Sequence, residues 1–194
     1  MKKLDVGNEL IQGMENAVAH AHDRKVSAND RISQNEPIRL IAMAKLNDED
    51  FAHVIRLAPL IAIDLILRDP EGKIFVARRN NEPAKGFYFV PGGSIYKNER
   101  LDDAFMRILA DETGLRAIRS EARFLGVYEH LYSTNCYGDP NFGSHYVVLG
   151  YELILKHRPD IHLDAQHSDY RWMSKTELLA DAKIHENTKA YFRT

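Results

Sequence analysis

The order of apolar and polar positions over residues 46–194 predicts short strands and helices. Apolar runs bounded by turn residues predict strands at residues 60–67, 73–79, 87–90, 121–132, 145–155 and 170–173. Helical spacing or a capping signature predicts helices at residues 47–58, 99–113, 174–181 and 186–192. The run at 145–155 is strongly apolar, so we expect it in the middle of a sheet.

Two of these helices carry a start signal. Asn47 is followed three positions later by Asp50, and Ser174 stands in the same relation to Glu177. The first side chain of such a pair accepts a hydrogen bond from a free backbone N–H, and the acid reaches back to the start of the helix. Pro59 ends the first helix.

The segment PGGSIYKNERLDDAFMRILADETGL, residues 91–115, predicts a tight glycine turn, a helix and a stop. Gly114 stands where a left-handed C-terminal cap is expected. Leu101, Phe105 and Ile108 recur on one face of the helix, which we expect to be buried.

Glu112 continues this apolar stripe and is expected to point into the protein, whereas Asp111 lies beside Arg107 on the flank. An acid in the last turn of a helix is disfavoured by up to about 1 kcal/mol. Glu112 therefore either meets a cation or frays into solvent. Arg107 and Asp111 stand four residues apart, which favours a salt bridge on the helix.

Two further polar features interrupt the strands. Asp64 lies inside the apolar run 60–67, where an acid is costly unless it is paired, so it either finds a partner or lies on a solvated face. Arg79 ends the next strand, and Arg binds phosphate with two parallel hydrogen bonds.

Residues 1–42 differ from the rest of the chain. Apolar positions at helical spacing predict an amphipathic helix over residues 8–22, and the polar residues 23–37 are typical of a linker. We interpret residues 1–42 as an appended extension and residues 43–194 as the main domain.

Composition excludes several classes. The 194 residues carry 26 basic and 28 acidic side chains, so no polyanion-binding or membrane-surface role is indicated. Cys136 is the single cysteine, which excludes a disulfide scaffold and favours a reducing compartment. Without an apolar span or signal peptide, we expect a soluble, cytoplasmic protein with no nucleic-acid or membrane partner.

Residues 93–115 resemble the Nudix box, in which G, five residues, E and seven residues precede R-E-aliphatic-x-E-E-x-G-aliphatic. The matching positions are Gly93, Glu99, Arg107, Leu109, Glu112, Gly114 and Leu115. Ile108 and Asp111 depart from two Glu positions. The resemblance implies an α/β Nudix fold, an α/β/α sandwich with a mixed sheet, and a divalent metal acting on a substituted nucleoside diphosphate. Since Ile108 cannot bind a metal, the metal site is reduced.

The strings LAPLIAIDLIL, ARRNNEPAKGFYFVPGG, YEHLY, SHYVVLGYEL and DAQHSDYRWMS are similar to the GDP-mannose mannosyl hydrolases of this family. The resemblance implies a homodimer that hydrolyses GDP-mannose, or GDP-glucose, to GDP and free sugar. Water attacks the anomeric carbon with inversion, and the pyrophosphate stays intact.

The same resemblance assigns site residues. It implies that the Gly92 carbonyl, Glu112 and Gln166 hold Mg²⁺, with Mn²⁺ as an alternative, and that His167 is the general base for water. Oxygen ligands are those that Mg²⁺ prefers, and imidazole suits proton transfer near neutral pH.

Five more residues are carried over around the leaving group. Arg79 and Arg107 resemble the residues that neutralise charge on departing GDP, and Tyr146 resembles a hydrogen-bond donor to it. Asp64 and His130 resemble groups that orient Arg79 or assist departure.

Three interpretations stay open. Ser94 stands where the resembling hydrolases have Arg, so Lys97 or Arg100 has to compensate or the rate differs. Asp111 keeps an acid that supports a Nudix pyrophosphohydrolase producing GMP and sugar phosphate. A non-catalytic nucleotide-sugar sensor is the third interpretation, although His167 argues against it because a sensor needs no base.

Overall fold

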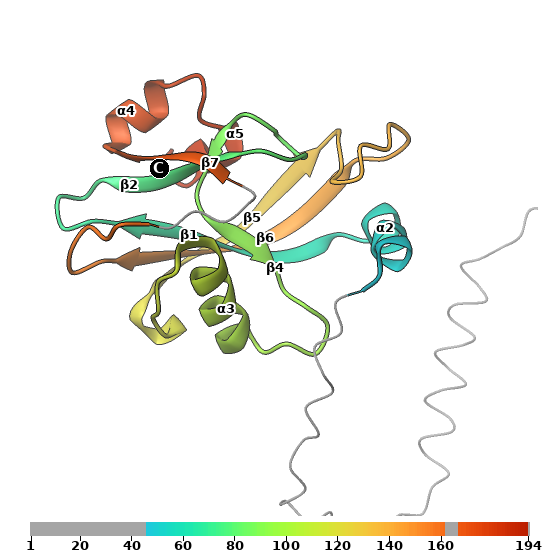
Figure 1. The fold of residues 1–194 in the computed structure, drawn as a ribbon, viewed down its shortest axis with the longest axis horizontal. Helices are drawn as coiled ribbons and strands as arrows, with labels where there is room; N and C mark the ends of the chain where they lie inside the picture. Colours follow the sequence, from blue (N-terminus) through green and yellow to red (C-terminus); the bar gives the residue numbers. More distant parts are fainter. Residues whose placement is uncertain (1–45, 162–166, 194) are drawn as a thin grey trace, which may run out of the picture. The chain divides into compact units, whose positions relative to one another are not determined.

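The computed structural model describes residues 46–161 and 167–193. Within them, seven strands form one mixed sheet with the order β3-β2-β1-β6-β5, while β4 pairs with β1 and β7 with β2 (Figure 1). The strands are β1 Leu60–Arg68, β2 Ile74–Arg79, β3 Tyr88–Phe89, β4 Gly92–Ser94, β5 Arg123–Tyr132, β6 Ser144–Ile154 and β7 His167–Met173. The helices are α2 Asp48–Leu57, α3 Leu101–Thr113, α4 Lys175–Ala180 and α5 Glu186–Ala190, with a 3-10 turn at Arg119–Glu121.

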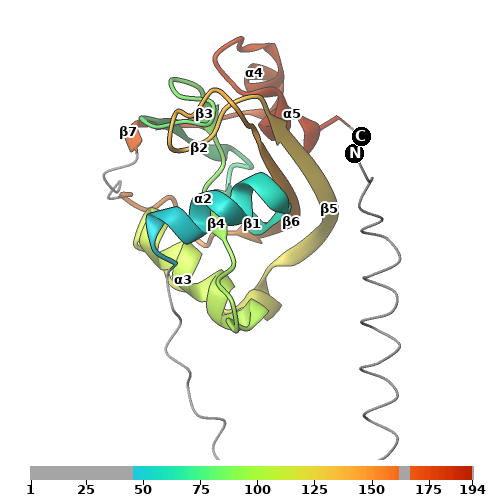
Figure 2. The ribbon, with the colours of Figure 1, turned by 90° about the vertical axis from the view of Figure 1, so that its right-hand side faces the viewer.

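Strand β1 is the centre of the sheet. It runs parallel to β6 and antiparallel to β2 and β4. Because β6 lies between β1 and β5, the prediction that residues 145–155 form a central strand is confirmed, and β5 forms an outer edge (Figure 2).

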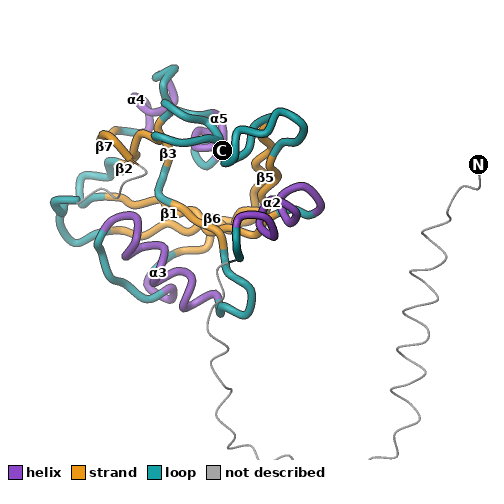
Figure 3. Tube along the Cα trace, turned by 45° about the vertical axis from the view of Figure 1, so that its right-hand side comes forward, coloured by secondary structure: helices purple, strands orange, loops and turns teal. Residues whose placement is uncertain are grey.

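Helices cover both faces of the sheet. Helix α3 lies on one side, whereas α4 and α5 lie on the other (Figure 3). Side chains of β1 point alternately to the two faces of the sheet. Ile63 and Leu65 pack in the hydrophobic cluster that contains Phe105 of α3, whereas Ile66 packs in the cluster that contains Leu178 of α4. The predicted α/β/α sandwich is therefore confirmed.

The predicted caps are present. The Asp50 backbone N–H donates to Asn47 Oδ1 over 2.9 Å, and Ser174 and Glu177 form a reciprocal capping box. Gly114 has φ 72°, and its N–H donates to the Ala110 carbonyl over 2.8 Å, which ends α3 as expected.

Some boundaries differ from the predictions. Helix α3 begins at Leu101, which is 40% exposed, so the buried stripe starts at Phe105. The helix begins late because Glu99 binds the Tyr96 backbone N–H instead of entering it. The predicted turn at Gly92 and Gly93 is strand β4. It pairs with residues 62–64 of β1, whereas β2 pairs with β1 at Arg68.

Further boundaries shift by a few residues. Strand β3 is shorter than predicted, at Tyr88–Phe89, and β5 starts at Arg123 because a 3-10 turn precedes it. The predicted helix at residues 8–22, the linker and the boundary at residue 42 lie outside the described residues. Among the described helices, none has the length and apolar character needed to cross a bilayer.

Candidate active site

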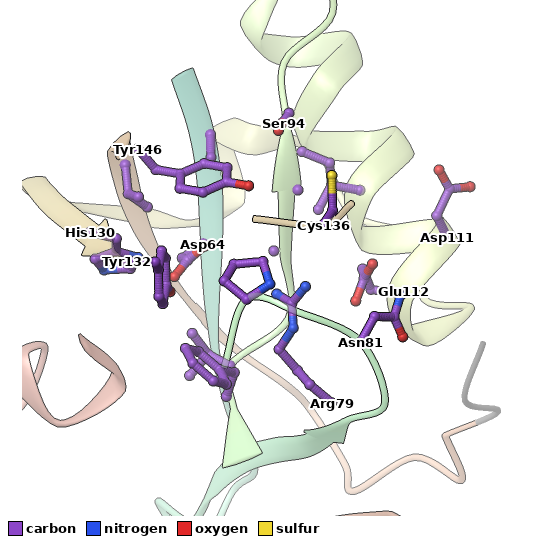
Figure 4. Close-up of a pocket in the computed structure, with 18 of the residues that line it drawn as sticks. Asp64, Arg79, Asn81, Ser94, Asp111, Glu112, His130, Tyr132, Cys136 and Tyr146 are labelled. Carbon is purple, nitrogen blue, oxygen red and sulfur yellow. The ribbon is translucent and has the colours of Figure 1, made fainter. Parts of the chain in front are cut away.

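A cavity of about 330 Å³ opens where β1, β2, β4, β7 and the end of α3 meet (Figure 4). Eight of the nine predicted site residues line it: Asp64, Arg79, Gly92, Arg107, Glu112, His130, Tyr146 and His167. The ninth, Gln166, lies outside the described residues. The fold therefore brings together residues from six strands and from helix α3.

Strand β4 reaches the cavity because it carries glycine. A Cβ at Gly92 would lie 2.2 Å from Asp64 Oδ1 and 2.9 Å from the Ile63 carbonyl oxygen, which no side chain tolerates. A Cβ at Gly93 would lie 3.2 Å from Ile108 Cγ1. Ile108, at one of the two departures from the box, is buried against this strand and belongs to the core.

Asp64 has a partner, as one of its two interpretations required. Tyr191 Oη donates a hydrogen bond to Asp64 Oδ2 over 2.7 Å. Burial raises the pKa of Asp64 to about 7, while the Tyr191 hydrogen bond and the charge of Arg79 act in the opposite direction. The carboxyl therefore changes charge near neutral pH.

His130 lies on the buried side of β5, where burial and then the nearby His185 lower its pKa to about 4. The ring is therefore uncharged at neutral pH. Its Nε2 atom is 3.3 Å from Tyr191 Oη. The structure thus connects Asp64, Tyr191 and His130.

Arg107 is bound by a buried acid that the sequence analysis did not pair with it. Its Nε and Nη2 donate to Glu99 over 2.7 and 2.9 Å, and Nη2 also donates to the Ser94 carbonyl over 2.9 Å. Burial alone would raise the pKa of Glu99, but hydrogen bonds from Arg107 and the Tyr96 N–H and the charge of Arg107 hold it below the ordinary value. The expected contact with Asp111 is also present, at 3.6 Å. Arg107 therefore ties β4 to α3.

Replacing Glu99 with Gln should lower the free energy of unfolding by about 2–4 kcal/mol at pH 7, because it removes the nearest carboxylate from the half-buried Arg107 charge and leaves the exposed Asp111 beside it. Since the folded-state pKa of Glu99 is lowered, this contribution is present above its unfolded pKa and is lost as the pH falls. Urea unfolding of both proteins at pH 7 and pH 4 measures the loss. Asp111→Asn, at an exposed partner, should cost under about 0.5 kcal/mol. Equal effects of the two variants would contradict the role of Glu99.

Glu112 and Asp111 point in different directions, as predicted. The Glu112 side chain is 11% exposed and that of Asp111 is 63% exposed. Glu112 extends from α3 and Arg79 from β2 toward the same space, whereas Asp111 points away from it (Figure 4). Glu112 therefore presents a carboxylate to the cavity, and Asp111 lies at its rim.

His167 begins β7 and is paired in register with Arg79 of β2, after a local irregularity between Ala77 and Arg79. Its Nδ1 lies 3.7 Å from Glu112 Oε2, and its side chain is 9% exposed. The pairing of two strands therefore places a histidine, an arginine and a carboxylate in one cavity.

Two aromatic residues that the sequence analysis did not assign to the site, Tyr132 and Phe89, also line the cavity. The ring centroid of Tyr132 lies 5.9 Å from that of Tyr146 and 5.5 Å from that of His185. The Cζ atom of Arg79 lies 5.7 Å from the centroid of the Phe89 ring. Burial raises the pKa of Tyr132 to about 12 and raises that of Tyr146, so both hydroxyls stay protonated. Ser94 lines the cavity, whereas neither Lys97 nor Arg100 is among the described residues that line it.

Residues 58–193 match the family profile described as NUDIX domain. The chain belongs to the Nudix family. It is similar to the low-salt glycan biosynthesis protein Agl8 of Haloferax volcanii, with 35% identity over 127 residues, covering 66% of this chain and 78% of Agl8. It is also similar to an ADP-ribose pyrophosphatase of Methanocaldococcus jannaschii, with 38% identity over 72 residues, covering 37% of this chain and 41% of that protein.

Solved structures share the fold. A MutT protein from Methanosarcina mazei has a TM-score of 0.57 at 18% identity, covering 69% of this chain and 91% of that one. The NUDIX domain of NrtR from Shewanella oneidensis, complexed with ADP ribose, has a TM-score of 0.54 at 18% identity, covering 76% and 96%. This chain therefore has the Nudix fold that its box implies.

Proposed function

We propose that this Nudix hydrolase hydrolyses GDP-mannose, and GDP-glucose as a second substrate, to GDP and free sugar by attack of water at the anomeric carbon. The observation that carries the proposal is the changed box. Ile108 is buried in the core, while Glu112 and His167 lie 3.7 Å apart in the cavity. One inward carboxylate beside a histidine suits a reaction in which a metal has only to assist a leaving group.

The residues present fit a lightly coordinated metal. Nudix hydrolases generally use Mg²⁺ or Mn²⁺. No group of three His, Cys, Asp or Glu side chains suited to a metal occurs within residues 46–161 and 167–193. Glu112 supplies one carboxylate, and the glycine strand beside Asp64 brings the Gly92 backbone to the same cavity. We assign Gly92, Glu112 and Gln166 as the ligands of Mg²⁺, which accepts a few oxygen ligands and retains water. When bound, the ion neutralises charge on the pyrophosphate.

The protein groups then divide the reaction between two sides of the sugar. His167 takes a proton from water as the water oxygen forms its bond to the anomeric carbon. The bond from that carbon to the β-phosphate oxygen breaks, and its electron pair leaves with GDP. Arg79 and the protonated Tyr146 hydroxyl stabilise the departing oxygens. Arg107 contributes charge beside the pyrophosphate while Glu99 fixes its position.

The two similar proteins differ in how strongly they support a nucleotide sugar as the substrate. Agl8 is named as a glycan biosynthesis protein, which is consistent with a nucleotide sugar. The ADP-ribose pyrophosphatase supports a second candidate function, cleavage of the pyrophosphate to GMP and sugar phosphate. Asp111 favours this second function, because it retains an acid next to Glu112 at the cavity rim. A sensor is disfavoured by the Glu112–His167 pair, which binding alone does not need.

Hydrolysis of GDP-mannose with Mg²⁺ in oxygen-18 water should place the label in free mannose and leave GDP unlabelled. Attack at carbon forms the new bond to the sugar, whereas attack at phosphorus forms it to a phosphate. Mass spectrometry of the products measures where the label goes. Label in GMP or mannose phosphate would overturn attack at carbon and make Asp111 the residue to explain. No turnover of any GDP-sugar would favour a sensor.

A further inference from the structure

The hydroxyl of Tyr191, which is far from both residues in the sequence, contacts two residues that line the cavity. Tyr191 follows α5 and is 6% exposed. Its Oη lies 2.7 Å from Asp64 Oδ2 and 3.3 Å from His130 Nε2. Asp64 and His130 both line the cavity, on β1 and β5, while Tyr191 reaches them from the layer formed by α4 and α5.

Glycines make the space for this contact. In the sheet, Asp64 is paired with Gly92 of β4 on one side and with Gly150 of β6 on the other. A Cβ at Gly150 would lie 2.9 Å from Tyr128 Cε2 and 3.2 Å from Tyr191 Cε1. The lack of a side chain at Gly150 therefore leaves room beside Asp64 for the Tyr191 ring. This ring packs edge-on against the ring of Tyr128, with 4.4 Å between the two ring centroids.

The direction of the hydrogen bonds follows from the available protons. Above a pH of about 7 the Asp64 carboxylate is ionised and only accepts, so the single hydroxyl proton of Tyr191 goes to Asp64. The hydroxyl oxygen then accepts from His130, which requires the neutral ring to carry its proton on Nε2. Burial together with the charge and hydrogen bond of Asp64 raises the pKa of Tyr191, so its proton is retained.

We propose that Tyr191 is a positioning residue, whose hydroxyl holds the Asp64 carboxylate and fixes the tautomer of His130 at the cavity wall. Asp64 held in this way lies close enough to Arg79 for the Arg79 charge to lower the pKa of its carboxyl. The effect on turnover rests on the proposed function, because Arg79 meets the leaving group there. The fixed tautomer of His130 does not depend on the substrate.

Tyr191→Phe tests this, since it removes the hydroxyl and keeps the ring. The kcat for GDP-mannose should fall about 10- to 100-fold, the range for loss of a hydrogen bond to a charged group, with KM changed less than about threefold. Nitrogen-15 NMR at pH 8.5 should report the Nε2–H tautomer of His130 in the parent protein and a changed signal in the variant. His130→Gln assigns the resonance.

Tyr128→Phe is the matched control, because it removes a hydroxyl from the neighbouring ring. It should leave kcat within about twofold and the His130 signal unchanged. Gly150→Ala is a second route, since its methyl group would lie 2.9 Å from Tyr128 and 3.2 Å from Tyr191, so both rings have to shift and the His130 signal should change. It also keeps the test available if Tyr191→Phe fails to fold.

The two readouts separate this inference from the proposed function. An unchanged His130 signal in folded Tyr191→Phe would overturn the positioning role, whether or not GDP-mannose is the substrate. A changed signal with unaltered kcat would overturn the effect on catalysis. A changed signal in a protein that turns over no GDP-sugar would support the contact while contradicting the proposed function.

Discussion

Replacing His167 with Gln should lower the kcat of GDP-mannose hydrolysis by about 10²-fold or more, the typical contribution of a general base. The amide retains hydrogen bonding but cannot take the proton from water. The side chain is 9% exposed at the start of β7 and is held in register with Arg79, so the substitution changes chemistry in a fixed position. Steady-state kinetics with saturating Mg²⁺ measures the loss.

The binding of GDP distinguishes loss of the base from loss of the site. Calorimetry should give a Kd for GDP within about threefold of the parent value, because His167 acts on water on the far side of the sugar. His157→Gln, at an exposed loop position, is the matched control and should leave kcat unchanged. Undiminished turnover in His167→Gln would remove this residue from the mechanism.

Local sequence rules predicted much of this site correctly. Helical periodicity alone directed Glu112 inward and Asp111 outward, and the side-chain exposures of 11% and 63% agree. The caps at Asn47 and Ser174 were also predictable, because each depends on groups within three residues. The family box singled out Gly93, which lies against Ile108 of α3 in the structure.

Contacts between distant parts of the chain were not predictable in the same way. Tyr191 and Asp64 are 127 positions apart, and no spacing rule relates a residue after α5 to one in β1. Glu99 gave a weak signal, since it matches the box, but its bond to Arg107 depends on the chain turning back before α3. Strand β4 likewise exists because β1 offers it an edge.

The sequence also predicted that Ile108 removes a metal-binding carboxylate from the box, and the packing of Ile108 bears on this prediction. Ile108 stands at a Glu position of the box, and the structure buries it against Gly93. Ile108 packs with Phe105 in the core cluster and also lines the cavity. The departure therefore places an apolar side chain where the box has a carboxylate, which on our proposal leaves more of the metal binding to Glu112.

Replacing Glu112 with Gln should raise the Mg²⁺ concentration needed for half-maximal hydrolysis by about tenfold or more, because an amide is a weaker and uncharged ligand for a hard cation. In a site with few carboxylates, each one carries a large share of the affinity. A titration of initial rate against Mg²⁺ measures the shift, and Asp103→Asn on the exposed face of α3 should leave it unchanged.

The neighbouring acid decides between the two candidate reactions. Under attack at carbon, Asp111→Asn should shift the Mg²⁺ titration by less than about twofold, because its carboxylate is 63% exposed and already contacts Arg107 at 3.6 Å. A shift as large as that of Glu112→Gln would mean that both acids hold metal, as pyrophosphate cleavage favours. An unchanged titration in Glu112→Gln would contradict the assignment of this carboxylate as a ligand, since a ligand cannot lose its charge without weakening the ion that it binds.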